Sequence, residues 1–217
     1  MSTIIASGER RTAHQLVHDT LRRAILTGQI PGRARLVQAE LAEQMRVSTT
    51  PVREALRDLA SEGLVELDAH RGAIVHQPTS TELNEIYRIR QLLEPEVMSR
   101  AVKRISEQQL SEAGRILRLA ETDRDPAAWV ELNRRFHGIF SQAADSPRLR
   151  TIVDALQNSA TLYVVVALSR GTRTTDEANA QHRAILEAAR VGDVAEAQRV
   201  MLIHIRTTVD SLAVWTG

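Results

Sequence analysis

Three histidines in the second half of the chain, His137, His182 and His204, have spacings that can bring them to one metal ion. Asn133 precedes His137 by four residues, so a helix places both side chains on one face, one turn apart. The letters "VGD" around Gly192 predict a turn, with His182 ten residues before that glycine and His204 twelve after it. At a rise of 1.5 Å per residue these are roughly 15 Å and 18 Å from the turn, nearly the same level in an antiparallel helical hairpin.

Three neutral imidazoles and an amide oxygen suit a divalent ion such as zinc or nickel, and they leave a coordination position for water or a ligand carboxylate. The chain has no cysteine, so a thiolate metal site and a cysteine nucleophile are excluded. Two alternatives stay open. In the first, each histidine is an ordinary half-buried side chain and no metal binds. In the second, the open coordination position activates water in a metal-dependent hydrolase. The hydrolase lacks a glutamate beside the histidines that reads as a general base.

Arg90 occupies an unusual position, because it falls within the apolar stripe of a helix predicted at residues 81–104. The apolar members of that stripe are Leu83, Ile86, Leu93 and Val97. A buried arginine needs an anion. It either pairs with Glu94, one helical turn further on, or grips the carboxylate of a small ligand with two parallel hydrogen bonds.

The stretch "RVSTTPVREALRDLASEGLV" at residues 46–65 has apolar residues at helical spacing with arginines between them. Thr49 or Thr50 can cap this helix, and Pro51 fits its first turn. The apolar face consists of Val52, Ala55, Leu56 and Leu59, and Gly63 ends the helix. The residues left to face outward, toward a DNA major groove in this interpretation, are Ser48, Thr49, Thr50, Arg53 and Arg57.

The elements around this helix predict a winged helix-turn-helix. A first helix lies in "RTAHQLVHDTLRRAILTGQI" and ends at Gly28, "PGRARL" is a turn with a short extended piece, and "VQAELAEQM" is a second helix. The residues expected to face inward are Leu16, Val17, Leu21, Ala24 and Ile25 in the first helix, and Leu41, Ala42 and Met45 in the second. "LVEL" and "AIVH" form a β-hairpin around "DAHRG", where Gly72 permits a tight turn. Three helices and a hairpin are the layout of this DNA-binding fold.

The rest of the chain is predicted to be an all-helical bundle. A linker, "HQPTSTEL", leads into six helices expected at residues 81–104, 107–122, 126–144, 147–170, 174–191 and 194–214, with breaks at Pro126, Pro147 and "VGD". The β-branched stretch "LYVVVAL" has long helical patterns on both sides, which favours a buried helix over a strand. The fold class is therefore mainly α, with a winged helix-turn-helix at 10–77 and a six-helix bundle at 78–217.

Composition places the chain among globular proteins, with 43% hydrophobic and 25% charged residues and no uncharged apolar run of eighteen residues. Its start lacks the pattern of a secretory signal, so a cytoplasmic location is expected, with no membrane partner. The net charge of +1 does not by itself indicate a nucleic-acid-binding protein. All basic residues except Lys103 are arginine, whose planar group suits phosphates and guanine edges, although codon bias produces the same composition.

The first half resembles the DNA-binding domain of the GntR family of bacterial transcription regulators. This resemblance covers about residues 10–77 and rests on the "PG-R-L" turn, "LAEQ", "VS-TPVREAL-L--EGLV" and "RG--V". The second half is similar to the all-helical ligand-binding domain of the FadR-type branch, the FCD domain, through "IYRIRQLLEP", "N--FH", "SPRLR", "QHRAILEA", "GD---A" and the late His204. Six expected helices resemble the shorter, VanR-like form of that domain.

The resemblance implies a homodimer that binds a palindromic operator, usually as a repressor, and releases it when a small metabolite, often a carboxylate, binds the helical domain. It implies major-groove contacts from Arg53 and its helix. It also implies that the wing inserts into the minor groove around His70, Arg71 and Gly72. Thr49 stands where many relatives have a base-reading arginine, so the preferred operator sequence is expected to differ.

The resemblance also implies a metal site at His137, His182 and His204. Asn133 stands where many relatives have aspartate, which removes a charge, so the metal is expected to bind more weakly or to be a different ion. A small carboxylate would then be held by the metal and Arg90. A metal with a purely structural role, without control by a metabolite, is the remaining alternative.

Overall fold

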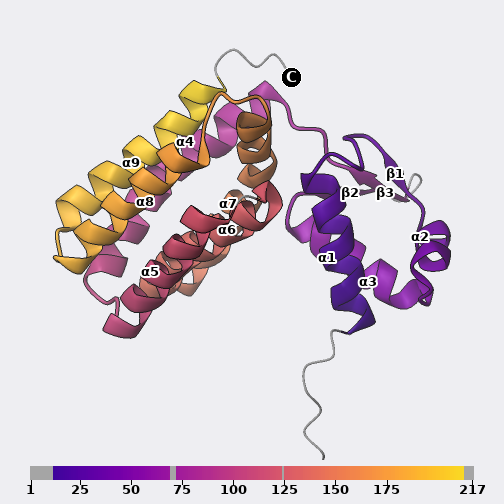
Figure 1. Ribbon diagram of the computed structural model, residues 1–217, viewed down its shortest axis with the longest axis horizontal. Helices are drawn as coiled ribbons and strands as arrows, with labels where there is room; N and C mark the ends of the chain where they lie inside the picture. The colour runs from indigo at the N-terminus through magenta and orange to yellow at the C-terminus, as the bar shows by residue number, and fades with distance from the viewer. Residues whose placement is uncertain (1–11, 69–71, 124, 213–217) are drawn as a thin grey trace, which may run out of the picture. The chain divides into compact units, whose positions relative to one another are not determined.

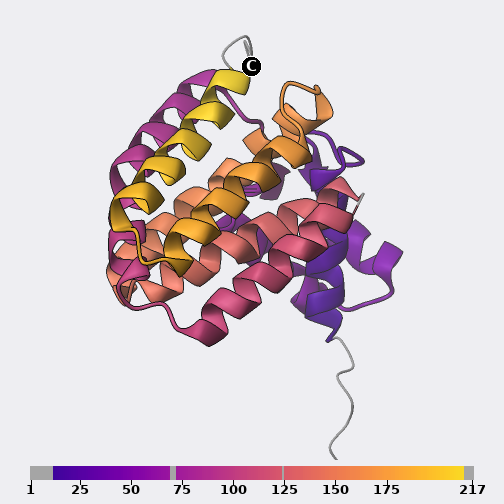
Figure 2. The ribbon, with the colours of Figure 1, turned by 60° about the vertical axis from the view of Figure 1, so that its left-hand side comes forward.

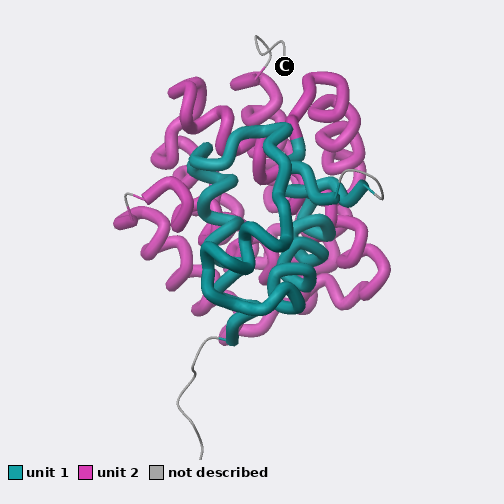
Figure 3. Tube along the Cα trace, turned by 90° about the vertical axis from the view of Figure 1, so that its right-hand side faces the viewer, with its two compact units in different colours: residues 1–76 teal, residues 77–217 magenta. Residues whose placement is uncertain are grey.

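The computed structural model describes residues 12–68, 72–123 and 125–212. The chain divides into two compact units, residues 1–76 and 77–217, which have different colours in Figure 3. This division falls within the stretch "HQPTSTEL", where the sequence predicts a linker. Each unit has buried apolar residues of its own, as separate domains do.

Unit 1 is a winged helix-turn-helix, as predicted (Figure 1). Its elements are α1 (Ala13–Leu26), β1 (Arg35–Leu36), α2 (Gln38–Met45), α3 (Thr49–Ser61), β2 (Val65–Asp68) and β3 (Gly72–Val75). β2 and β3 form the expected antiparallel hairpin, with Val65 opposite Val75. The extended piece in "PGRARL" is a further strand, β1, which pairs antiparallel with β3 and gives the order β1-β3-β2.

The apolar face of α3 forms as predicted, with Val52, Ala55, Leu56 and Leu59 all buried. The start of this helix differs from the prediction. Ser48, rather than Thr49 or Thr50, is the N-cap residue, with an extended backbone at φ −73° and ψ 167°. The first four N–H groups of a helix have no partner within it, so Pro51 costs no hydrogen bond at the third helical position and the helix begins upstream of it.

Leu16 was expected on the inward stripe of α1, but its exposed fraction is 46%. The buried residues are Val17, Leu21, Ile25 and Leu26. Successive residues are about 100° apart around a helix, so Leu16 falls beyond the edge of a stripe centred on Val17, Leu21 and Ile25. In α2, Ala42 is buried as expected, whereas its two larger apolar residues are half-buried.

Two histidines of α1 join this helix to α3. His14 Nε2 lies 2.8 Å from Asp58 Oδ2, and one turn further on His18 Nε2 lies 2.7 Å from Glu62 Oε1. Arg22 Nε donates to the second oxygen of Glu62 at 2.9 Å. The hydrogen bond with Glu62 raises the pKa of His18, so the pair gains charge attraction as the histidine takes up a proton. These polar contacts supplement the apolar packing between α1 and α3.

Unit 2 contains the six predicted helices within its described part (Figure 2). They are α4 (Ser80–Val102), α5 (Glu107–Thr122), α6 (Pro126–Ala143), α7 (Pro147–Ser169), α8 (Thr175–Arg190) and α9 (Val194–Ser211). Capping side chains accept a backbone N–H at the starts of α4, α5, α6, α8 and α9. Local capping and the proline breaks therefore explain why the predicted starts lie within one residue of those observed.

The helices of unit 2 surround a common core. α9 packs along α4 and α8, α5 packs on α6 and α8, and α7 packs on α4 and α6. The β-branched stretch "LYVVVAL" lies within α7, as predicted. By length and composition α7 is apolar enough to cross a membrane, with a mean hydropathy of 1.3, and 33% of that stretch is buried in one chain. Core helices of soluble bundles have the same property, so it is weak evidence for a membrane span.

Candidate metal site and nucleic-acid interface

The three predicted histidines meet in the core of unit 2. His137 comes from α6, His182 from α8 and His204 from α9, and all three are buried. Their ring centroids are 4.7–5.0 Å apart, and one nitrogen from each ring lies within 4.8 Å of the others. The turn at Gly192, which has a positive φ of 76°, sets α8 beside α9 and brings two of the rings to one level.

Burial keeps these imidazoles neutral. It lowers the pKa of His137 to about 4, and it lowers the pKa values of His182 and His204 well below the usual 6.5. Each ring therefore has one nitrogen with a free lone pair at neutral pH, which is the form that binds a metal. Both nitrogens of His137, and Nε2 of His182, lack a hydrogen-bond partner among the described residues.

These residues fit a divalent metal ion. A buried polar atom without a partner costs about 1–3 kcal/mol, and a metal would remove that cost at the one nitrogen of each ring that binds it. Zinc–nitrogen distances of about 2.0–2.1 Å place tetrahedral ligand nitrogens roughly 3.3 Å apart. The histidine nitrogens lie within 4.8 Å of one another, so they would have to approach by at most about 1.5 Å to bind zinc.

Aromatic residues hold His182 in place. Trp129 stacks on His182 with ring planes 18° apart, and Phe136 lies 4.7 Å from the same ring. Trp129 Nε1 donates to Asn179 Oδ1 at 3.1 Å, and the Asn179 amide donates to the backbone of Ala120 at 3.2 Å. The position of His182 is thus fixed from α5, α6 and α8 together.

A cavity of about 30 Å³ adjoins the histidines, which is room for about one water molecule. Its lining includes Arg90, Asn133, His137, Arg173 and His204. Asn133 therefore lies where the helical spacing predicted, on the same side of α6 as His137. The two buried arginines at this cavity have different surroundings.

Arg90 is buried in the apolar stripe of α4, as predicted, and it pairs with Glu94. Its Nε donates to Glu94 Oε1 at 2.5 Å, while Glu94 Oε2 accepts from Gln157 at 3.1 Å. The guanidinium also lies 4.7 Å from the ring centre of Tyr87. Of the two anions considered for Arg90, the intramolecular carboxylate is the one observed, so its charge is already compensated.

Arg173 is a buried cation that the sequence analysis did not single out. Its exposed fraction is 4%, and its hydrogen bonds go to neutral acceptors, Gln181 Oε1 at 2.7 Å and the His204 carbonyl at 3.4 Å. Burial lowers the pKa of the Arg173 guanidinium, and the nearby charge of Glu177 acts in the opposite direction. Arg173 precedes α8 in a break between helices, where apolar periodicity is lost. No sequence signal separates it from the exposed Arg170 nearby.

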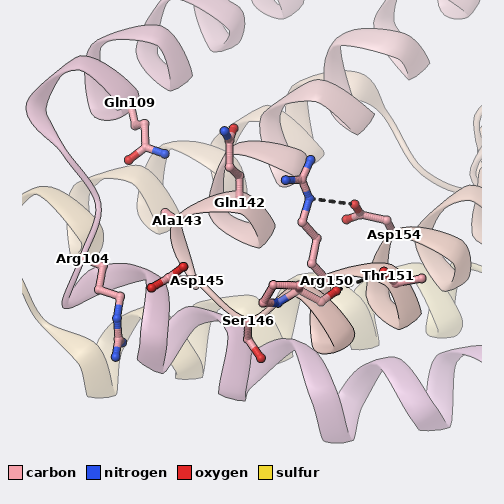
Figure 4. Close-up of a pocket in the computed structure, with 10 residues that line it drawn as sticks. Arg104, Gln109, Gln142, Ala143, Asp145, Ser146, Arg150, Thr151 and Asp154 are labelled. Carbon is pink, nitrogen blue, oxygen red and sulfur yellow. Dashed lines mark hydrogen bonds and ion pairs between the residues drawn. The ribbon is translucent and has the colours of Figure 1, made fainter.

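A second hollow, of about 920 Å³, lies at the turn between α6 and α7 (Figure 4). Polar side chains dominate its lining, but they do not converge on one point. Arg150 turns toward Asp154 and donates to its carboxylate at 3.3 Å, and Arg104 lies away from this pair. Its charged side chains either pair with each other or point to different places. This hollow is therefore a weaker candidate for ligand binding than the histidine cavity.

The residues predicted to read DNA lie on the outward side of α3. All five are exposed, on the side opposite the buried face: Ser48, Thr49, Thr50, Arg53 and Arg57. Within the described part of unit 1, neither arginine takes part in an ion pair. Both line a surface groove with Gly72, which starts β3 with a positive φ of 79°. His70 and Arg71, the other wing residues, lie outside the described residues.

Comparisons with known proteins agree with this two-unit arrangement. Residues 13–75 match the family described as "Bacterial regulatory proteins, gntR family", and residues 85–207 match the FCD domain. The probable D-xylose utilization operon transcriptional repressor of Paenarthrobacter nicotinovorans is 28% identical over 94% of this chain and 90% of that protein. The HTH-type transcriptional repressor RspR of Escherichia coli K12 is 28% identical over 92% and 88%. The structure of E. coli McbR/YncC shares the fold, with a TM-score of 0.75 at 22% identity over 94% of this chain and 98% of that one.

We predict that Arg90→Met lowers the free energy of unfolding of unit 2 by about 3–5 kcal/mol, because Glu94 is left buried without its cation. The double variant Arg90→Met, Glu94→Leu is expected to recover most of that loss, since an apolar replacement of a buried ion pair is often close to neutral. Urea unfolding followed by the fluorescence of the buried Trp129 measures both. If the single and double variants lose the same free energy of unfolding, the main role of this pair is not to compensate the buried charge of each partner.

Proposed function

This chain belongs to the GntR family of bacterial regulatory proteins and carries an FCD domain, and from this premise we propose that it is a metabolite-responsive repressor. As a homodimer it binds a palindromic operator, and it releases the operator when a small carboxylate binds at the histidine cavity. The cavity has room for about one water molecule here, so it must widen to admit the carboxylate. The observation that carries this proposal is the cluster of three neutral histidines, which lies beside a cavity that His137, His204 and the buried Arg173 line. Its place of action is the cytoplasm, where bacterial DNA lies.

Membership of the family makes the chain a DNA-binding transcription regulator, and α3 is the helix proposed to read the operator. Arg53 and Arg57 are exposed on the side opposite the buried face, so both guanidinium groups are available to phosphates and guanine edges. The net charge of the chain is only +1, so affinity depends on where these arginines lie rather than on a broad basic field. The wing beside Gly72 adds contacts in the minor groove. Repression is proposed because two similar proteins are named as repressors.

We expect Arg53→Ala to weaken specific DNA binding about ten- to hundredfold, because a good base contact contributes about 1–3 kcal/mol of discrimination. The measurement is gel retardation with a DNA site selected by the wild-type protein from a random pool. Arg23→Ala, the same change in the last turn of α1, serves as the matched control and is expected to bind normally. Normal binding by Arg53→Ala would show that another element reads the DNA.

The histidine cavity is proposed as the place where metal and effector bind. His137, His182 and His204 would hold the ion, with Asn133 as a further oxygen ligand. A bound zinc or nickel ion supplies a Lewis-acidic position for a carboxylate oxygen. Arg173 lines the same cavity and, among the described residues, donates its hydrogen bonds to neutral acceptors; Arg90 lines the cavity as well. An effector releases DNA only if it binds one arrangement of the protein more tightly than the other.

The enzymatic alternative has less support. Glu94, the carboxylate that acts electrostatically on His137, is already bound by Arg90 and Gln157, so it is not poised to take a proton from water. The similar proteins are named as transcriptional regulators or repressors. A metal with a purely structural role can be distinguished from one that binds an effector, because only the second makes the melting temperature of the protein depend on a small carboxylate.

We predict that the metal-loaded protein melts at a higher temperature with one or more small carboxylates, since a ligand at a hundred times its dissociation constant adds about 2.7 kcal/mol to the folded state. The same carboxylate is expected to release DNA in gel retardation. His137→Ala is expected to lose both the metal, measured by elemental analysis, and the carboxylate response. His76→Ala, in unit 1, is the control and keeps both.

Two outcomes of this experiment would contradict the proposal. A metal-loaded protein whose melting temperature responds to no carboxylate would indicate a structural metal. Hydrolysis of esters or amides that disappears in His137→Ala would indicate the hydrolase.

A homodimer is proposed to form through α7. Only 33% of the apolar stretch of this helix is buried in one chain, and Ile152 is 52% exposed. Exposed apolar surface of this kind marks a protein–protein contact. One side of the helix carries three apolar residues at successive spacings of three and eleven, a pattern that suits helix–helix packing: Ile152, Ala155 and Val166. The six helices also fit assignment to the shorter, VanR-like form of the domain.

Ile152→Glu is expected to shift the protein from dimer to monomer at micromolar concentration, because two carboxylates would be buried at a two-fold interface. Light scattering coupled to size-exclusion chromatography gives the mass directly. Leu119→Glu places the same charge on the exposed side of α5, where the leucine is 42% exposed, and is expected to leave the dimer intact. If Ile152→Glu stays dimeric, another face forms the interface.

A further inference from the structure

Gln181 contacts one of the three buried histidines directly. It lies on α8, one residue before His182, and its Oε1 is 2.9 Å from Nδ1 of His204 on α9. In a neutral imidazole one ring nitrogen carries the proton and the other offers a lone pair. The position of the proton on His204 therefore decides which of its nitrogens is able to bind a metal.

The orientation of the Gln181 amide follows from its neighbours at both ends. Arg173 Nη2 lies 2.7 Å from one terminal atom, and a guanidinium group only donates, so that atom is the oxygen. The other terminal atom lies 3.0 Å from Thr207 Oγ1. The Thr207 hydroxyl donates its own proton to the carbonyl of Ile203 at 2.9 Å, so it accepts from Gln181. Both ends require the same orientation, with oxygen toward Arg173 and nitrogen toward Thr207.

This orientation determines the tautomer of His204. The oxygen of Gln181 accepts only, so the facing Nδ1 carries the proton and donates it. Arg173 Nη2 only donates and is 3.2 Å from the same nitrogen, so a proton on Nδ1 places two donors side by side. Both of these donors share Gln181 Oε1 as their acceptor, and the shorter contact of Nδ1 with that oxygen, at 2.9 Å, favours the proton on Nδ1. With the proton on Nε2 instead, two lone pairs would face each other at 2.9 Å.

We infer that Gln181 is a positioning residue, which keeps the proton of His204 on Nδ1 and leaves the Nε2 lone pair for a metal ion shared with His137 and His182. The inference rests on the metal site proposed above. Histidine ligands almost always donate their second nitrogen to an acceptor, and loss of that acceptor typically weakens metal binding about 10–100-fold. Arg173 and Thr207 act one step further out, by holding the amide.

The first test needs no metal. Long-range ¹H–¹⁵N spectra of the metal-free, full-length protein report which nitrogen of His204 carries the proton. Wild type and Gln181→Glu, which keeps an acceptor, are expected to show the Nδ1–H form. Gln181→Met, of similar length but without an acceptor, is expected to shift His204 toward the Nε2–H form. An Nε2–H form in the wild type would overturn the inference.

The second test measures zinc affinity by competition with a chelator. Gln181→Met is expected to bind zinc about 10–100-fold more weakly, and Gln181→Glu about as tightly as wild type. Gln198→Met makes the same change at a half-buried glutamine of α9, which donates to the Pro95 carbonyl, and is expected to bind normally. Circular dichroism checks that each variant folds.

The outcomes separate this inference from the function on which it rests. The positioning role would be overturned if Gln181→Met bound zinc as tightly as wild type. It would also be overturned if Gln181→Met and Gln181→Glu lost zinc affinity equally. If the wild type shows the Nδ1–H form but binds neither zinc nor nickel, the proposed metal site itself is wrong, and with it the purpose assigned to Gln181.

Discussion

Exclusion of water from the core of unit 2 is the constraint on which the candidate site depends. Desolvation disfavours the charged imidazolium, so His137, His182 and His204 stay neutral with lone pairs available at ordinary pH. The same burial removes the water that would otherwise satisfy their ring nitrogens. Buried ring nitrogens without hydrogen-bond partners are unfavourable unless a bound group contacts them. A divalent cation suits these three nitrogen ligands.

Burial also explains why the two arginines at the cavity differ in what they offer a ligand. Arg90 is neutralised by Glu94, and the Glu94 carboxylate is further satisfied by Gln157, so this network is complete without a ligand. Among the described residues, Arg173 donates to neutral acceptors, and one of these hydrogen bonds orients Gln181. Under the proposed function, Asn133 adds no negative charge to the metal site, so an anionic effector supplies the charge that the protein leaves out.

Much of this architecture was predictable because its determinants are local. Capping residues and prolines mark the starts of the bundle helices, and the apolar period of α3 follows from four side chains that are all buried. The meeting of the histidines was also accessible, since a turn at Gly192 and a fixed rise per residue place His182 and His204 at one level. Less local features were missed. β1 is only two residues long and exists through its pairing with β3, and Leu16 turned outward because the exact rotation of α1 depends on what packs against it.

By itself, then, the sequence determined the order of helices, the winged helix-turn-helix with its outward arginines, and the three histidines that share a level in the bundle. These depend on periodicity, capping and spacing, which act within a few residues of one another. Only the tertiary structure decided that Glu94 takes Arg90, that Arg173 enters the cavity from a break between helices, and that Gln181 faces His204. Helical spacing had already offered Glu94 as one of two possible partners of Arg90. The positions of Arg173 and Gln181 depend on which side chains become neighbours when several helices exclude water together, and no interaction along the chain specifies them.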